Sequence, residues 1–124
     1  MKLLVAIIQP RKLDYLTSAL RRAGIPGITV TPAKGFGKET AESDWDLSGE
    51  LSNKVKVELV VQDEKCEEIV RIVQKTVSTG KPGDGLIYVQ DLVFTVRIST
   101  GERRTGEINI EQIRQSAQED IPEA

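Results

Sequence analysis

The stretch KVKVELVVQD, residues 54–63, decides the fold. Residues 54–61 alternate between apolar and mostly polar side chains, which is typical of a strand with one buried face. Asp63 follows at a position suited to cap a helix. The apolar side chains after it recur at helical spacing: Cys66, Ile69, Val70, Val73 and Val77. The stretch therefore predicts a strand that leads into an amphipathic helix, with the Cys66 thiol in the core.

The first part of the chain repeats this order. Residues 3–8, LLVAII, form an apolar run that is typical of a strand buried on both faces. Residues 12–24 then have a helical apolar face and end at a glycine, which commonly stops a helix. Residues 28–31 alternate as a short strand. We expect the second half to close with a long strand over residues 86–98, bent near 90–91.

The resulting βαββαβ order predicts an α+β, ferredoxin-like sheet with both helices on one face. The opposite face is then left without a covering layer. Residues 3–8 and 86–89 are apolar on both faces of their strands, so that bare face should be hydrophobic. An exposed apolar surface of this size is usually covered. We therefore expect an oligomer in which sheet packs against sheet.

Length and composition exclude several classes of protein. The 124 residues favour one domain, and a net charge of −2 argues against a nucleic-acid binder. The chain has no histidine and one cysteine, which excludes histidine-dependent catalysis, imidazole metal sites and an intrachain disulfide. No apolar run is long enough to span a membrane. We expect a cytoplasmic protein that is not an enzyme, requires no metal and does not insert into membranes.

Two segments depart from the regular pattern. Residues 33–53 show almost no periodicity, and a loop of this length within a compact domain is usually functional. Residues 79–85, TGKPGDG, form a second glycine-rich loop. Each segment combines glycines with a lysine, Lys38 or Lys81, so each could present backbone N–H groups and positive charge to a phosphate. Neither has the spacing of a Walker or dinucleotide-binding loop, so simple turns are an alternative.

Four motifs, taken in order, resemble the PII signal-transduction family: GFG at 35–37, KVKVE at 54–58, TGKPGDGLIYV at 79–89 and TGE at 100–102. The resemblance covers residues 1 to about 102. It implies a homotrimer of ferredoxin-like subunits with sheets packed around a three-fold axis, in agreement with the bare apolar face. It also implies adenine nucleotides bound between subunits, and control of a client protein through a long loop.

The resemblance divides the chain into a PII-like domain, residues 1–102, and a C-terminal extension, residues 103–124. Residues of about 37–53 correspond to the T-loop, which contacts client proteins. Residues 79–86 correspond to the B-loop, which cradles phosphates. The T-loop lacks the tyrosine that is uridylylated in familiar members. We therefore expect a divergent, PII-like member of the family.

The correspondence also implies the nucleotide-binding residues. Some surround the adenine base, and others hold the phosphates from the base of the T-loop, the B-loop and the last strand. They are Thr29, Gly35, Phe36, Gly37, Lys38, Glu58, Val60, Lys81, Gly83, Asp84, Gly85, Leu86, Arg97 and Ser99.

Two of these positions depart from the family pattern. Typical members have lysine at the position of Leu86 and a second arginine at that of Ser99. Charge-assisted contacts to phosphate contribute about 1.5–3 kcal/mol each, and the triphosphate carries the most charge. We therefore expect ADP or AMP to bind at least as well as ATP. Arg103 and Arg104 either compensate from the next segment or are solvated surface side chains.

The effector and the client are also suggested by the resemblance. Lys38, Glu39 and Lys54 form a candidate site for an effector anion, and Lys54 corresponds to a lysine that meets 2-oxoglutarate. Glu39 replaces the usual glutamine and would repel that dicarboxylate. This favours a subgroup in inorganic-carbon metabolism, with bicarbonate as effector. Trp45 and Leu47, in an acidic T-loop, are candidate anchors for a membrane transporter or metabolic enzyme.

Three alternatives remain open at the level of sequence. The first is a nitrogen regulator that binds Mg-ATP and 2-oxoglutarate. The second is a purely structural trimer, because a fold does not determine a function. The third is a slow ATPase, although no carboxylate pair or general base is evident near either glycine-rich loop.

Overall fold

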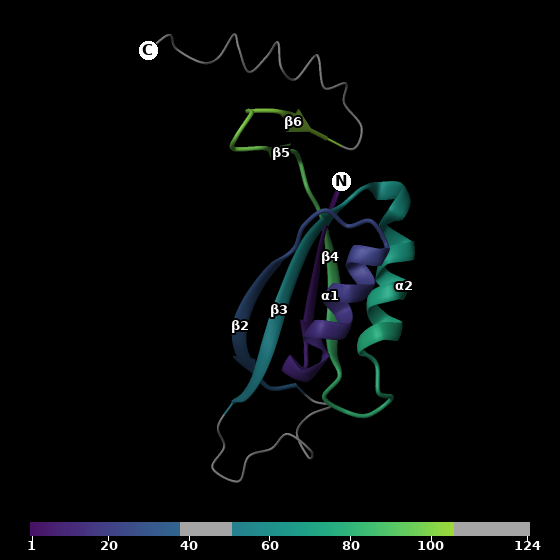
Figure 1. Ribbon diagram of the computed structural model, residues 1–124. Helices are drawn as coiled ribbons and strands as arrows, with labels where there is room; N and C mark the ends of the chain where they lie inside the picture. The colour runs from purple at the N-terminus through teal and green to yellow at the C-terminus, as the bar shows by residue number, and fades with distance from the viewer. Residues whose placement is uncertain (38–50, 106–124) are drawn as a thin grey trace.

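The computed structural model describes residues 1–37 and 51–105. Each of the first two βαβ segments places one helix between two strands, and two short strands follow (Figure 1). The elements are β1 (Lys2–Ile8), a 3-10 helix (Pro10–Lys12), α1 (Leu13–Arg22), β2 (Thr29–Gly35), β3 (Ser52–Val61), a 3-10 helix (Asp63–Lys65), α2 (Cys66–Val77), β4 (Gly85–Asp91), β5 (Thr95–Val96) and β6 (Arg103–Arg104). The order from β1 to β4 confirms the predicted α+β, ferredoxin-like fold.

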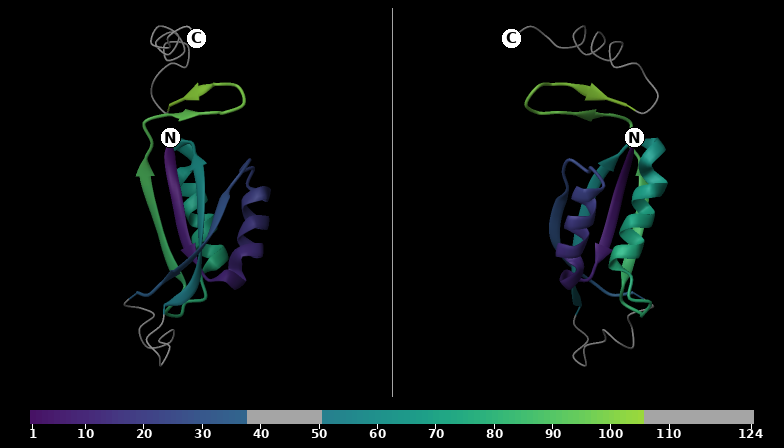
Figure 2. Two further views of the ribbon diagram at one scale, coloured as in Figure 1. Left: turned by 90° about the vertical axis from the view of Figure 1, so that its left-hand side faces the viewer. Right: turned by 45° about the vertical axis from the view of Figure 1, so that its right-hand side comes forward.

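The main sheet has the strand order β2-β3-β1-β4, and every neighbouring pair is antiparallel. The first strand is therefore central, as its continuous apolar sequence requires. Both helices lie on one face of the sheet (Figures 1 and 2). None of the helices in the described residues is long and apolar enough to cross a membrane.

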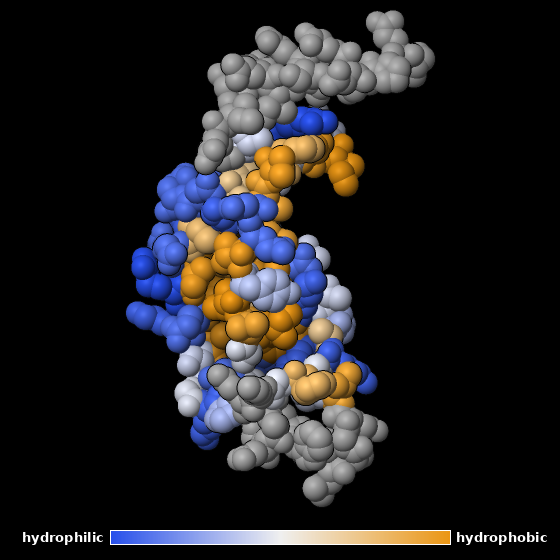
Figure 3. Space-filling view, turned by 180° about the vertical axis from the view of Figure 1, so that it is seen from behind, coloured by the Kyte–Doolittle hydropathy of each residue, from blue (hydrophilic) through white to orange (hydrophobic). Residues whose placement is uncertain are grey.

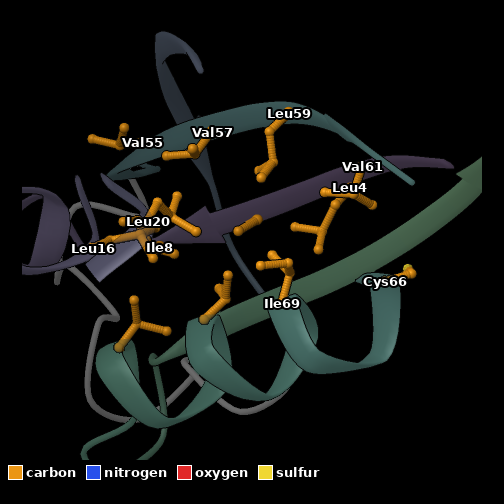
Figure 4. Packing of buried hydrophobic residues seen from close by; sticks show 13 residues of the cluster. Leu4, Ile8, Leu16, Leu20, Val55, Val57, Leu59, Val61, Cys66 and Ile69 are labelled. Carbon is orange, nitrogen blue, oxygen red and sulfur yellow. The ribbon is translucent and has the colours of Figure 1, made fainter. Parts of the chain in front are cut away.

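The core lies between the helices and the sheet (Figure 4). The register places Leu4, Ala6 and Ile8 of β1 opposite Leu59, Val57 and Val55 of β3, on the face toward the helices. From the helices, Leu16, Leu20, Ile69 and Val73 are almost completely buried. The Cys66 side chain is 8% exposed and belongs to this cluster, so the prediction of a core thiol is confirmed. Burial raises the pKa of that thiol.

The first helix ends as its sequence predicts. Gly24 has a φ of 83°, a left-handed conformation that glycine adopts without a steric penalty. The N–H of Ile25 then donates to the carbonyl of Leu20 at 3.0 Å, which satisfies one of the last helical carbonyls.

The predicted helix cap at Asp63 is wrong. Gln62 precedes the 3-10 helix, and no side chain caps the N-terminus of that helix or of α2. The Asp63 carboxylate instead lies 2.7 Å from the amino group of Met1. This ion pair, with its hydrogen bond, lowers the pKa of Asp63 against a smaller opposing effect of burial. Because β1 begins beside the end of β3, a tertiary partner was available that local sequence does not reveal.

The strand predicted over 86–98 is two strands. The fourth strand ends at Asp91, and the chain leaves the sheet before β5, which pairs with β6 in a separate hairpin. The N–H of Leu92 donates to the carbonyl of Met1 at 3.0 Å, beyond the last pair of the sheet. The second strand is also longer than predicted: it continues to Gly35 because β3 begins as early as Ser52.

The middle of the sheet face opposite the helices is apolar, as predicted, and polar side chains flank it (Figure 3). Because side chains alternate along a strand, the register places these residues on it: Leu3, Val5, Ile7, Val60, Leu86 and Tyr88. Further apolar side chains on and beside the β5–β6 hairpin are exposed: Val93, Phe94, Val96 and Ile98. The hairpin projects past the end of the sheet where β1 begins (Figure 2). No layer of the described residues covers either surface.

Candidate functional site

Four of the expected nucleotide-binding residues meet at the end of the sheet where β1 begins. Thr29, Glu58, Val60 and Arg97 line one hollow of about 420 Å³. Thr29 lies directly opposite Glu58 in the pairing of β2 with β3. The segment that follows β5 brings Arg97 to the same place. The fold thus gathers residues from three separate stretches of sequence.

This hollow combines an apolar wall with polar side chains. The side chain of Val60 is 41% exposed and supplies an apolar wall. The Glu58 carboxylate supplies hydrogen-bond acceptors, and its Oε1 lies 3.2 Å from Nζ of Lys56 on the same strand. Ligand sites typically combine such an apolar surface with a few placed polar groups.

A second hollow of about 710 Å³ adjoins the first, because Pro26, Val60 and Arg97 line both. It lies between the main domain and the β5–β6 hairpin. Ser99, the remaining expected residue from the segment after β5, and Arg104 line this second hollow. We call Thr29, Glu58, Val60, Arg97 and Ser99 the hairpin-end set.

The B-loop lies at the opposite end of the sheet and has a defined shape. Gly80, Gly83 and Gly85 have φ values of 76°, 95° and 118°, which side chains rarely tolerate. The Asp84 carboxylate accepts hydrogen bonds from the Thr79 N–H at 2.8 Å and the Gly80 N–H at 3.0 Å. It also accepts one from the Thr79 hydroxyl. Asp84 therefore fixes the loop internally.

These contacts change the acidity of Asp84. Partial burial tends to raise the pKa of its carboxyl group, but the hydrogen bonds from Thr79, Gly80 and Lys81 outweigh it and lower the pKa. The charged form is thus favoured by the folded loop.

Lys54 contacts the B-loop from the neighbouring strand. Its side chain is only 7% exposed, and its Nζ lies 3.4 Å from the carbonyl oxygen of Gly83. The Gln9 amide donates to the same oxygen at 2.5 Å. The expected effector residue Lys54 therefore ties the B-loop to β3, the strand that follows the T-loop. Sequence reasoning missed Gln9, although Gln62 repeats it after the equivalent strand of the second half.

The other expected residues at this end lie in the B-loop itself or at the end of β2. Gly35 ends β2, and its carbonyl accepts a hydrogen bond from the Ser52 hydroxyl at 2.9 Å. The Phe36 side chain is 80% exposed, and that of Leu86 is 65% exposed opposite Ile7 on the open face. The B-loop-end set comprises Gly35, Phe36, Gly37, Lys81, Gly83, Asp84, Gly85 and Leu86. The expected residues Lys38, Glu39, Trp45 and Leu47 lie outside the described residues.

The two sets lie at opposite ends of one subunit. Leu3 of β1 pairs with Val60 of the hairpin-end set, whereas Ile8 pairs with Gly85 of the B-loop-end set. Five residues of strand correspond to a separation of about 17 Å.

Within residues 1–37 and 51–105, no group of three or more potential metal ligands is found.

Comparison with known proteins shows similarity to one protein family. Residues 1–102 match the family model described as "Nitrogen regulatory protein P-II". The chain is 42% identical over 106 residues to nitrogen regulatory protein GlnK of Escherichia coli (strain K12), covering 82% of this chain and 95% of that protein. It is 42% identical over 107 residues to nitrogen regulatory protein P-II of Rhodospirillum rubrum, covering 83% of this chain and 96% of that protein.

Proposed function

The chain belongs to the P-II family of regulatory proteins, and we propose that it is a homotrimer that binds adenine nucleotides between subunits and signals their state to a client protein. Its PII-like domain spans residues 1–102, and residues 103–124 form an extension. The B-loop holds phosphates, and the T-loop, residues of about 37–53, contacts a membrane transporter or a metabolic enzyme.

The separation of the two residue sets carries this proposal. One chain places the hollow lined by Thr29 and Glu58 far from the glycines of its own B-loop. A second copy that packs its open apolar face against the first can supply the missing half. Burial of Leu86 and Tyr88 in that contact would favour the assembly, at roughly 25 cal/mol for each Å² of apolar surface.

The nucleotide preference follows from the side chains that face the phosphates. Leu86 and Ser99 carry no charge where relatives typically carry cations. Arg97 and Lys81 remain, which suits one or two phosphate groups better than three. We therefore propose ADP or AMP as the principal ligand, with ATP bound no more tightly.

The proposed effector is bicarbonate, and the proposed setting is inorganic-carbon metabolism. The single charge of bicarbonate is compatible with a site that holds both Lys54 and Glu39, whereas a dicarboxylate would be repelled. Since Lys54 contacts the Gly83 carbonyl, an anion drawn to Lys54 would act on the B-loop as well as on the T-loop. That contact offers a route by which effector and nucleotide influence one another.

Titration calorimetry tests this function. AMP, ADP and ATP are titrated into the full chain, each alone and with bicarbonate or 2-oxoglutarate. We expect ADP or AMP to bind at least as tightly as Mg-ATP, with affinity increased by bicarbonate and unchanged by 2-oxoglutarate. Binding of Mg-ATP that strengthens with 2-oxoglutarate would contradict the proposal.

That contrary result would support a second candidate, a nitrogen regulator. The names of the relatives, which are 42% identical to this chain, favour it. A thermal transition unchanged by every nucleotide would instead indicate a structural trimer. Sustained phosphate release from ATP above about one per minute would require a barrier below roughly 20 kcal/mol and would indicate an ATPase.

A further inference from the structure

The β5–β6 hairpin has two chemically different faces. Thr95 pairs with Arg104 and Val96 with Arg103, and the N–H of Arg97 donates to the carbonyl of Glu102 at 2.8 Å. Because side chains alternate along a strand, Arg97 and Arg104 share one face and Arg103 lies on the other. The guanidinium of Arg103 lies 4.8 Å from the ring centre of Phe94, as this alternation requires.

The face with Arg97 and Arg104 lines the hollow of about 710 Å³. Three cationic side chains and one anionic side chain line it: Lys65, Arg97, Arg104 and Glu102. Such an excess of positive charge in a concave surface attracts anions. The hollow adjoins the smaller one that Thr29 and Glu58 line, and Arg97 lines both.

The guanidinium of Arg104 is held by an ion pair with Glu102. Its Nε lies 3.1 Å from Oε1 of Glu102, two residues earlier in the chain. A guanidinium has five N–H donors in a planar fork, so this contact leaves its terminal nitrogens as donors for a ligand. The Arg104 guanidinium would then bind the Glu102 carboxylate through Nε and a phosphate through its terminal nitrogens.

We propose that Arg104 is a second phosphate-binding arginine beside Arg97, and that Glu102 is the residue that positions it. This inference rests on the proposed nucleotide-binding function and adds a residue to that site. A base in the smaller hollow directs its phosphates past Arg97 into the larger one, where Arg104 meets them. The ligand class is a nucleoside mono- or diphosphate.

Calorimetry with adenosine, AMP and ADP tests the role of Arg104. In the full chain, R104Q should weaken ADP and AMP binding at least tenfold and leave adenosine binding unchanged. R104K keeps the charge but not the planar fork, so it should weaken ADP and AMP binding less than R104Q does. R103Q is the matched control, because it removes the same charge from the opposite face, and its ADP affinity should equal that of the wild type. E102Q should weaken ADP binding several-fold.

The outcomes separate this inference from the function on which it rests. Wild-type protein that binds no adenine nucleotide would overturn both. Wild-type binding of ADP with unchanged affinity in R104Q would overturn the role of Arg104 alone. An equal loss of adenosine and ADP binding in R104Q would also overturn it, because a phosphate contact cannot affect the nucleoside. The mass of each variant in solution verifies that assembly is intact.

Discussion

The backbone of Gly85 lies so close to the carbonyl of Ile7 that a Cβ at position 85 would come within 1.8 Å of that oxygen. Gly85 also has a φ of 118°, which is outside the range of ordinary residues. Because residue 85 is a glycine, the chain can pass from the B-loop into β4 in close contact with β1. This contact fixes where the B-loop stands relative to the sheet.

Gly85→Ala should destabilise the protein by about 2 kcal/mol or more, because both the overlap and the backbone conformation oppose a side chain. Gly80→Ala is the matched control in the same loop. It has a positive φ of 76° but no atom within 4 Å of the added Cβ, so about 1–2 kcal/mol is expected. Denaturant unfolding measures both. Equal losses of unfolding free energy in the two variants would show that the close contact with Ile7 adds nothing to the cost of a side chain at position 85.

The B-loop should loosen in acid. Because the folded state lowers the pKa of Asp84 below its ordinary value of 3.8, the charged carboxylate stabilises the loop above that pH. This contribution is lost as the pH falls through the folded pKa. Hydrogen exchange of the Thr79 and Gly80 amides, which both donate to Asp84, should show protection at pH 7 that declines below about pH 4. In Asp84→Asn, protection should be lower at pH 7 and independent of pH; the same decline in that variant would contradict this cause.

The main fold could be predicted from sequence because its periodicities are strong and local. The alternation at Val55–Val61 and the helical spacing from Cys66 to Val77 both appear in the structure at those positions. The internal repeat then leaves few ways to arrange four strands. The apolar open face also follows, because Leu86 and Tyr88 occupy positions on a strand that alternation alone determines.

The errors in prediction all involve tertiary partners. Asp63 has the sequence context of a helix cap, yet its carboxylate forms an ion pair with the amino group of Met1. The apolar residues after Asp91 continue a sequence pattern that is typical of a strand. In the structure they lie in or beside a separate hairpin, whose second strand is only Arg103–Arg104. Sequence also could not show that Gln9 and Lys54 share the Gly83 carbonyl, since those contacts depend on the packing of three distant segments.

The assembly should depend on the open face of the sheet. Tyr88 lies there, opposite the buried Val5 of β1, and is 39% exposed. Tyr88→Arg should reduce a trimer to smaller species, because a charge would be buried in an apolar contact. Tyr15→Arg is the control, since Tyr15 is 65% exposed on α1, on the opposite side of the subunit. Light scattering gives the masses; a trimer that is equally stable in both variants would contradict packing through this face.

In the proposed trimer, each nucleotide site combines the hairpin-end set of one copy with the B-loop-end set of another. Two variants each disable one half: E58A with R97A at the hairpin end, and G80D with K81E at the B-loop end. Neither variant alone should bind ADP. When the two are co-expressed and mixed trimers are isolated, one of every three clefts in a mixed trimer has both halves intact.

The most direct measurement is the number of ADP molecules bound by those mixed trimers. We expect about one third of the wild-type stoichiometry at nearly wild-type affinity, because one cleft in three is complete. Mixed trimers that bind no ADP, although the wild type does, would show that the site is not shared between copies. They would place the whole site within one chain.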